Sequence, residues 1–240
     1  MISVCIASYN GEKYIKQQLD SILSQLRKGD EVIISDDSSE DHTIEIIKSY
    51  KDKRIKLLEN CTFKSPIFNL ENALNEAKGD YIFLADQDDI WLSYKISHTI
   101  EKLKNFDLVV CNGLIVDQDK NVIHPSYFEW KGSRPGFLKN LAKNSYLGCS
   151  IAFNRKILNK VLPFPKHIIM HDLWIGLIGE VIGKVHFIEE PLFCYRRHES
   201  NYTADISKGD HELSDFGFWF KIWYRMVMVY YVGRRVVFNR

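Results

Sequence analysis

The chain has 240 residues, of which 45% are hydrophobic, and its 32 Lys and Arg residues nearly balance its 31 Asp and Glu residues. This length suits one large domain with a sizeable core, and the composition excludes a disordered chain. The net charge of +1 gives no reason to expect nucleic acid as a partner, so any affinity for anions must be local.

The cysteines and the first residues bear on the cellular compartment. Five cysteines lack the spacing of a zinc site, and most of them lie in apolar runs. This pattern predicts reduced core thiols rather than disulfides. The chain begins directly with a strand-like run, without the basic and apolar segments of a secretory signal. We therefore expect a cytoplasmic protein.

The first half of the chain alternates predicted strands with predicted helices. Apolar runs that read as buried strands occupy residues 2–7, 31–35, 55–58 and 81–85. Apolar spacing of three and four predicts helices between them, of which the first covers 12–25 and the third begins at Pro66. This alternation predicts an α/β fold with a mostly parallel, doubly wound, Rossmann-like sheet.

Polar clusters follow three of these strands. They are Ser8-Tyr9-Asn10, Asp36-Asp37 and the acidic run from Asp86 to Asp89. Ligands of such sheets bind outside the carboxyl ends of the strands, so we expect the three clusters to lie together. No glycine-rich loop follows the first strand, which disfavours nicotinamide and P-loop enzymes. An aromatic ring such as Tyr9 can instead stack on a nucleotide base.

The acidic run indicates the chemistry. Carboxylates as close as those of Asp86, Asp88 and Asp89 raise one another's pKa unless a cation lies between them. Oxygen ligands suit Mg²⁺ or Mn²⁺, and both ions keep positions open for phosphate oxygens. The run therefore predicts a divalent metal at Asp86 and Asp88 and a substrate with a diphosphate. For Asp89, a cap on the next helix is an alternative.

The second half is less regular. The pattern predicts a helix at 94–104, a strand at 108–112, a hairpin turn at 117–121 and a strand at 148–153. The aromatic residues of the loop at 125–136 either cover an active site or form a separate apolar cluster. A further helix runs from His171-Asp172 to Ile182, and Asp172 alone would be read as its cap.

The last stretch, 216–238, combines many aromatic residues with Lys and Arg. Its charges interrupt the apolar run too often for a membrane-spanning helix. Basic residues among aromatic ones suit a helix that lies in the membrane interface, which predicts a peripheral membrane contact. The alternative is a helix packed on the domain or on a second subunit of a homo-oligomer.

Five motifs in order resemble family-2 glycosyltransferases of the GT-A fold. They are VCIASYN at 4–10, SDDSSED at 35–41, ADQDDIW at 85–91, HDLW at 171–174 and YRRHESN at 195–201. The last two resemble a bacterial branch that includes rhamnosyltransferases of surface polysaccharide assembly. The resemblance implies a GT-A domain at 1–205, with a nucleotide-sugar half at 1–112 and an acceptor half with a smaller mixed sheet region at 113–205. Residues 206–240 would be a helical tail.

The resemblance also implies roles for the matched residues. The donor nucleotide would be bound by Ala7, Ser8, Tyr9, Asn10, Asp36, Asp37 and Asp86. Asp88 would be the main ligand of the metal, assisted by Asp86 and His198, and the diphosphate would contact Arg196 and His198. Asp172 would be the catalytic base, and Trp91 and Trp174 would contact the acceptor. The family often has Thr where this chain has Ala7, and an uncharged polar residue where it has Arg197.

The implied activity is an inverting, metal-dependent transfer of a sugar to a hydroxyl of a lipid-linked surface glycan, at the inner face of the plasma membrane. The first candidate donor is dTDP-rhamnose, and a galactosyl- or glucosyltransferase that uses a UDP-sugar is an alternative. A catalytically inactive nucleotide-binding module at the membrane is another. A phosphatase would need a nucleophilic Asp after the first strand, and a nucleotidyltransferase would need a glycine-rich basic loop there; neither is present.

Overall fold

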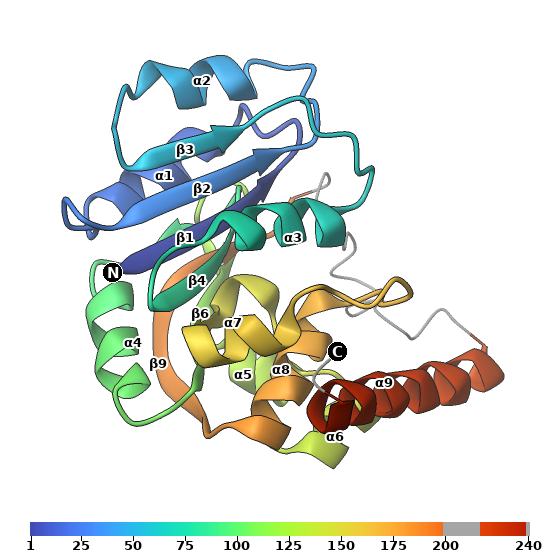
Figure 1. The fold of residues 1–240 in the computed structure, drawn as a ribbon. Helices are drawn as coiled ribbons and strands as arrows, with labels where there is room; N and C mark the ends of the chain where they lie inside the picture. The colour runs from blue at the N-terminus through green and yellow to red at the C-terminus, as the bar shows by residue number, and fades with distance from the viewer. Residues whose placement is uncertain (199–216, 239–240) are drawn as a thin grey trace.

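The computed structural model describes residues 1–198 and 217–238, which form one α/β body around a nine-stranded sheet (Figure 1). The strand order is β3-β2-β1-β4-β8-β6-β9-β5, and β7 pairs with β6. The strands are β1 Ile2–Ser8, β2 Glu31–Asp36, β3 Ile55–Leu58, β4 Tyr81–Asp86, β5 Ile90–Trp91, β6 Leu108–Val116, β7 Val122–His124, β8 Ile151–Asn154 and β9 Val185–Arg196. The helices are α1 Ile15–Leu23, α2 Thr43–Ser49, α3 Pro66–Glu76, α4 Lys95–Leu103, α5 Tyr127–Lys131, α6 Phe137–Ala142, α7 Arg155–Val161, α8 His171–Ile182 and α9 Phe218–Phe238, with a 3₁₀ turn η1 at Gly148–Ser150.

The first four strands along the chain, β1 to β4, pair in parallel, which confirms the predicted doubly wound half. Ile6 of β1 lies opposite Ile34 of β2 and Ala85 of β4, and all three are buried. Their continuous apolar character reflects helices on both faces, since a strand covered on both sides has no polar face. This packing brings the carboxyl ends of β1, β2 and β4 to one edge of the sheet.

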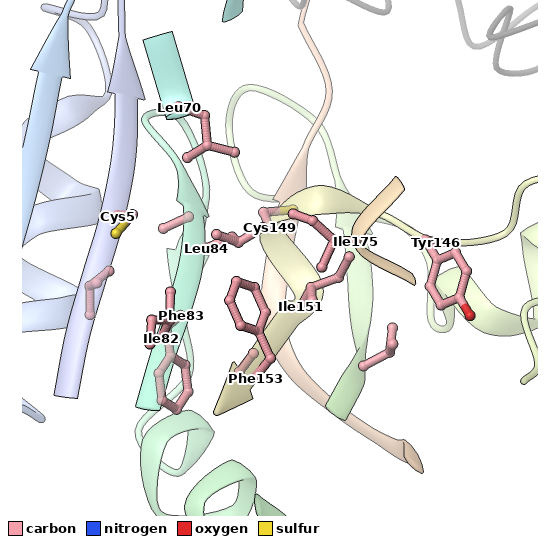
Figure 2. Packing of buried hydrophobic residues seen from close by; sticks show 14 of the residues in the cluster. Cys5, Leu70, Ile82, Phe83, Leu84, Tyr146, Cys149, Ile151, Phe153 and Ile175 are labelled. Carbon is pink, nitrogen blue, oxygen red and sulfur yellow. The ribbon is translucent and has the colours of Figure 1, made fainter. Parts of the chain in front are cut away.

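The other half of the sheet is mixed, as the resemblance implied. Strand β8 runs antiparallel to both β4 and β6, whereas β9 runs parallel to β6. Figure 2 shows the core at this junction, where Phe83 of β4 and Phe153 of β8 gather with Leu70 of α3 and Ile175 of α8. The reversal at β8 joins the two halves into a single sheet with a shared core.

The aromatic segment predicted as a loop is helix α5. Ser126 accepts a hydrogen bond from the Glu129 backbone N–H at its start, and Gly132 ends it in the left-handed conformation. Tyr127 and Phe128 are 1% and 4% exposed, so they belong to the core. The expectation that they cover an active site is wrong, and they do not form the separate apolar cluster of the alternative either, because they belong to the main core, against which Trp130 packs.

Helix α9 packs on α8 and α6 and keeps a second face exposed. Tyr224, Met228 and Val232, spaced by four, are buried, whereas Trp219 is 80% exposed. Of the helices in the described ranges, none has the length and apolar character that crossing a membrane requires. The expected boundary between residues 205 and 206 and the motif residues Glu199, Ser200 and Asn201 lie outside the described residues.

Candidate active site

The ends of β1 and β2 are joined by buried hydrogen bonds. Asp36 is completely buried, and its carboxylate accepts hydrogen bonds from the hydroxyls of Ser8 and Ser39, both at 2.7 Å. The Ser39 backbone N–H donates to the same carboxylate at 2.8 Å. Since a buried carboxylate needs such partners, the segment after β2 has little freedom to move. Asp36 therefore shapes this loop from inside rather than offering an open contact to a ligand.

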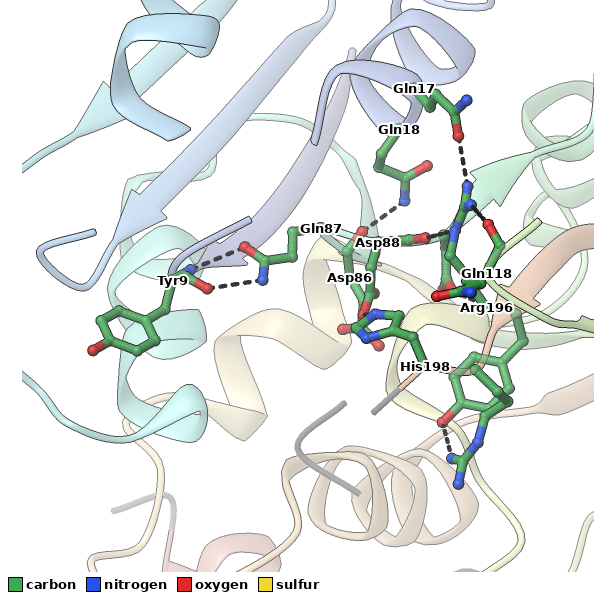
Figure 3. A network of polar contacts seen from close by, with 12 residues as sticks. Tyr9, Gln17, Gln18, Asp86, Gln87, Asp88, Gln118, Arg196 and His198 are labelled. Atoms are coloured by element: carbon green, nitrogen blue, oxygen red, sulfur yellow. Dashed lines mark hydrogen bonds and ion pairs between the residues drawn. The ribbon is translucent and has the colours of Figure 1, made fainter. Parts of the chain in front are cut away.

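The segments that follow β1 and β2 carry side chains suited to a nucleotide. Tyr9 is 53% exposed, and the side-chain amide of Gln87 holds its backbone N–H and carbonyl, both at 2.9 Å (Figure 3). Asn10 adopts φ of 47° and accepts a hydrogen bond from the Glu40 N–H at 2.8 Å. One oxygen of Asp37 accepts from the Phe63 N–H at 2.6 Å. An exposed aromatic ring on a fixed backbone and a carboxylate thus lie at the ends of β1 and β2.

Strand register places Ala7 opposite Asp86, the last residue of β4. Burial, followed by the negative charge of Asp88, raises the pKa of Asp86 to about 7. Burial and the same charge also raise the pKa of Asp89 well above its ordinary value. The negative charges of this run therefore act on one another, as the sequence predicted. Asp86 also lies next to the end of β1, which the first polar cluster follows.

Asp89 does not cap the next helix. Helix α4 starts at Lys95, and Asp89 instead accepts a hydrogen bond from the backbone N–H of Arg196 at 3.1 Å. The side chain is buried, and this hydrogen bond links residues 86–89, here called the acidic turn, to the end of β9. This link between positions far apart in the chain explains why the helix-cap alternative is wrong.

Two neighbours of the acidic turn had no signal in the sequence. Ligand atoms of Asp86, Asp89 and Cys149 all lie within 4.8 Å of one another. Lys95 is 2% exposed, and its ammonium donates to the Cys149 carbonyl at 2.8 Å and lies 4.5 Å from the centre of the Trp91 ring. This positive charge lowers the pKa of Asp86, against the larger upward effects of burial and Asp88. A spacing-based search misses both residues because tertiary contacts alone bring them here.

The end of β9 approaches the acidic turn from the other side. Nε2 of His198 lies 2.9 Å from Oδ2 of Asp88. The Arg196 guanidinium is 2% exposed and donates to the carbonyls of Asp88 and Gln118, each at 2.8 Å, and to the side chain of Gln17 at 2.7 Å. Its three nitrogens are thus engaged with protein oxygens, which does not support the expected contact with a diphosphate.

Asp172 lies in the first turn of α8 and is 6% exposed. Oδ2 accepts a hydrogen bond from the Asn144 side chain at 3.1 Å, and Oδ1 accepts from the Leu173 N–H at 2.7 Å. Its charge contributes to the raised pKa of Asp86, so the two carboxylates are within electrostatic reach. Burial lowers the pKa of the neighbouring His171, which packs so tightly against Gly148 that a Cβ there would lie 2.5 Å from Nε2.

The two tryptophans expected at the acceptor are core residues. Trp174 is 0% exposed, and its indole N–H donates to the Val161 carbonyl at 2.9 Å. Trp91 is 3% exposed and packs against Phe83. Neither ring offers a surface to an acceptor, contrary to the expectation. Residues two apart on a helix point to different faces, so a site at Asp172 does not require that Trp174 also face it.

The arrangement suits a divalent cation. Asp86 and Asp88 would supply carboxylate oxygens, and His198, which lies beside Asp88, would supply an imidazole nitrogen. Hard oxygen ligands with one imidazole fit Mn²⁺ or Mg²⁺. Burial, followed by the negative charge of Asp88, raises the pKa of Asp86, and a divalent ion would offset the repulsion between these carboxylates. All five cysteines are free; Cys5, Cys111 and Cys149 are buried as predicted, whereas Cys61 and Cys194 are only partly buried.

Comparison with known proteins finds similarity to glycosyltransferases. The model of Glycosyl transferase family 2 matches residues 3–162. The chain is 31% identical over 222 residues to an uncharacterized glycosyltransferase of Methanocaldococcus jannaschii, with coverage of 87% of this chain and 75% of that protein. It is 29% identical over 217 residues to the UDP-Glc:alpha-D-GlcNAc-diphosphoundecaprenol beta-1,3-glucosyltransferase WfgD of Escherichia coli, covering 87% of this chain and 81% of the relative.

Solved structures share the fold at low identity. The crystal structure of S. aureus TarS 1-349 with UDP-GlcNAc aligns with a TM-score of 0.70 and 18% identity, covering 95% of this chain and 66% of that one. The mannosyltransferase PcManGT from Pyrobaculum calidifontis, in complex with GDP-Man and Mn²⁺, aligns with a TM-score of 0.62 and 20% identity, covering 84% of this chain and 58% of that one. The chain thus spans less than two thirds of these solved chains.

Proposed function

This chain belongs to glycosyl transferase family 2, and from that premise we propose that it is an inverting, metal-dependent enzyme that moves a hexose from a nucleotide-diphosphate sugar to a hydroxyl of a lipid-linked glycan. The observation that carries the proposal is the convergence at one sheet edge. The Asp37 N–H donates to the Ser8 carbonyl at the end of β1, and the Tyr9 N–H donates to Gln87, between Asp86 and Asp88. The charge of Asp172 acts on Asp86 from α8, so residues from separate parts of the chain support one site.

We assign the donor nucleotide to the ends of β1 and β2. The exposed ring of Tyr9 offers a flat face on which a pyrimidine can stack, and the carboxylate of Asp37 can accept a ring N–H. Asp36 is the buried support of this loop. The diphosphate then extends toward Asp86 and Asp88, which would hold a divalent ion; such an ion would supply positive charge that stabilises the leaving group.

We assign the role of general base to Asp172. In the transfer step, the acceptor oxygen forms a bond to the anomeric carbon and gives its proton to the Asp172 carboxylate. The bond from the anomeric carbon to the diphosphate oxygen breaks, and the nucleoside diphosphate leaves with the electron pair. A single displacement of this kind inverts the anomeric centre. The hydrogen bonds from Asn144 and the Leu173 N–H fix the carboxylate in one orientation, which favours such a role.

The donor we propose first is UDP-glucose. The Escherichia coli relative WfgD, which matches over 87% of this chain, is named for UDP-Glc and for an acceptor on diphosphoundecaprenol. The second candidate is dTDP-rhamnose, because HDLW at 171–174 and YRRHESN at 195–201 resemble the rhamnosyltransferase branch. Uracil and thymine present the same ring N–H and carbonyl edge, so the contacts of Tyr9 and Asp37 suit either base.

The exposed face of α9 suits contact with a membrane, where a lipid-linked acceptor would lie. Phe218, Trp219 and Trp223 are 68%, 80% and 47% exposed. The first turns of α9 project from the molecule on the side toward which the arrowheads of β2 and β3 point (Figure 1). Aromatic side chains with nearby basic residues suit a membrane interface. We therefore propose that α9 rests on the membrane near the site that receives the acceptor.

The direct test is a transfer assay with purified protein, a panel of UDP- and dTDP-sugars, and Mn²⁺ or Mg²⁺, with a diphosphate-linked N-acetylglucosamine lipid as the acceptor. We expect release of nucleoside diphosphate to require the metal and to increase when the acceptor is present. Metal-dependent nucleotide binding without turnover of any donor would instead favour the inactive binding module.

A further inference from the structure

We propose that Tyr14 and Arg196 are positioning residues that hold the backbone and side chain of Asp88 in the arrangement that binds the divalent ion. This inference rests on the proposed function, because it takes Asp88 as a metal ligand. It gives Arg196 a different task from the diphosphate contact that the family resemblance implied. It also assigns a task to Tyr14, which otherwise reads as an apolar residue before α1.

Arg196 joins three separate elements. Its Nε donates to the Asp88 carbonyl at 2.8 Å, one terminal nitrogen donates to the Gln118 carbonyl at 2.8 Å, and the other donates to Gln17 Oε1 at 2.7 Å (Figure 3). These partners lie in the acidic turn, in the turn between β6 and β7, and on α1. A rigid guanidinium fixes the directions of its hydrogen bonds, whereas a lysine ammonium cannot. The backbone of Asp88 is thus tied to the rest of the site.

Tyr14 holds the same assembly from one side. Its ring is 8% exposed and lies 4.7 Å from the Arg196 guanidinium carbon. The His198 ring lies 4.5 Å from the Tyr14 ring, with an interplanar angle of 31°. His198 in turn contacts Oδ2 of Asp88 at 2.9 Å. Tyr14 therefore contacts both the residue that holds the Asp88 backbone and the residue that meets its carboxylate.

The neighbouring residues of the turn are fixed by equivalent contacts. The Gln18 side chain donates to the Asp86 carbonyl at 2.7 Å, and Gln87 is held by the backbone of Tyr9. Helix α1 thus reaches the turn through Gln18 directly and through Gln17 by way of Arg196. A site that must place a metal ligand within a fraction of an ångström needs such support. The arrangement accounts for buried Arg196 without requiring that it touch a ligand.

The test compares UDP and dTDP affinities with and without Mn²⁺, by isothermal titration calorimetry, in wild type and four variants. Gln17→Ala removes an exposed partner of Arg196 without changing any charge. Arg196→Lys keeps the charge and loses the fixed hydrogen-bond directions. Tyr14→Leu removes the ring, and Tyr14→Phe is the matched control that keeps it.

We expect the gain in nucleotide affinity on adding Mn²⁺ to fall by about tenfold or more in Arg196→Lys, and by less in Gln17→Ala and Tyr14→Leu. The affinity without Mn²⁺ and the melting temperature of Gln17→Ala should stay at the wild-type values, and Tyr14→Phe should match wild type. A direct diphosphate role for Arg196 predicts the opposite: metal-free affinity falls in Arg196→Lys and Gln17→Ala has no effect. That result would overturn the proposal.

The same titrations distinguish the proposed metal-dependent function from the positioning role of Tyr14 and Arg196. If Mn²⁺ does not increase the affinity of wild-type protein for either nucleotide, the proposed metal-dependent function is wrong. If wild type shows the increase and Gln17→Ala, Arg196→Lys and Tyr14→Leu all keep it, the function stands and the positioning role is wrong. Purely structural damage would lower the melting temperature of a variant together with its metal-free affinity, which also contradicts the proposal.

Discussion

Nε2 of His198 lies 2.9 Å from Oδ2 of Asp88, although 110 positions separate the two residues. The contact closes the acidic turn from the C-terminal end of β9, whereas Ala7 borders Asp86 from β1. The proposed metal site therefore depends on strands from both halves of the sheet. Substitutions of the site residues next to β1 or β9 should weaken metal binding more than they weaken the fold, because the hydrophobic core lies away from this edge of the sheet.

The first prediction separates metal binding from proton transfer. Asp88→Ala should abolish transfer and also remove the effect of Mn²⁺ on nucleotide affinity, because it deletes the proposed main ligand. Asp172→Asn should abolish transfer but keep Mn²⁺-dependent nucleotide binding, since an amide has a similar shape and no basic oxygen. Transfer assays and calorimetric titrations with UDP and dTDP measure both effects. An active Asp172→Asn enzyme would mean that another group takes the proton.

A second prediction concerns Tyr9, whose ring is 53% exposed and whose backbone is held by Gln87. Tyr9→Ala should weaken nucleotide binding with and without metal by about 1–3 kcal/mol, the usual effect of losing one stacking partner of a base. Tyr9→Phe keeps the stacking face and should bind as wild type does. The melting temperature should not change in either variant, because the ring contributes little to the core. Equal affinities for all three proteins would place the base elsewhere.

Much of the fold follows from local patterns. The apolar runs around Ile6, Ile34 and Ala85 are long enough, and alternate regularly enough with amphipathic helices, to predict the parallel half of the sheet. Parallel strands end at one edge, so the closeness of Tyr9 and Asp86 followed as well. The helical segment at Tyr127 was missed because it is only five residues long and depends on the Ser126 cap and on Asn112, which accepts from the Phe128 N–H.

The parts of the site that could not be predicted depend on backbone carbonyls and distant contacts. Arg196 binds the carbonyls of Asp88 and Gln118, and a carbonyl leaves no mark on residue identity. Cys149 meets Asp86 only because η1 packs on β4. Trp91 was expected to contact the acceptor, but it is a core residue. It lies two positions after buried Asp89, so in an extended segment both side chains point to the core.

The third prediction concerns pH. Burial, then the charge of Asp88, raises the pKa of Asp86 to about 7 in the folded state. In the unfolded chain an Asp titrates near about 3.9, so the folded state holds the proton more tightly. Stability without metal should therefore decrease as the pH rises from about 4 to about 7, because the folded protein must release a proton that it binds better than the unfolded chain does.

Mn²⁺ should reverse this trend, since it replaces the proton at the carboxylates. Thermal unfolding with excess Mn²⁺ should show a larger stabilisation at about pH 8 than at about pH 6, as expected of a ligand that competes with protons. Asp86→Asn is the control, and it should have a flatter dependence of melting temperature on pH without metal. A stabilisation by Mn²⁺ that is independent of pH would show that the ion does not bind to Asp86.

The last prediction concerns the two faces of α9. Tyr224 is 0% exposed, and its hydroxyl accepts a hydrogen bond from the Ile169 N–H, so Tyr224→Ala should lower the free energy of unfolding by about 3–5 kcal/mol. Trp219 and Trp223 are 80% and 47% exposed, so replacing both by Ser should leave stability nearly unchanged. The double variant should nevertheless bind less well to phosphatidylglycerol vesicles in a sedimentation assay, because interfacial binding depends on buried aromatic area. If its vesicle binding equals that of wild type while Tyr224→Ala alone changes stability, α9 serves only to complete the core, and the membrane contact lies elsewhere.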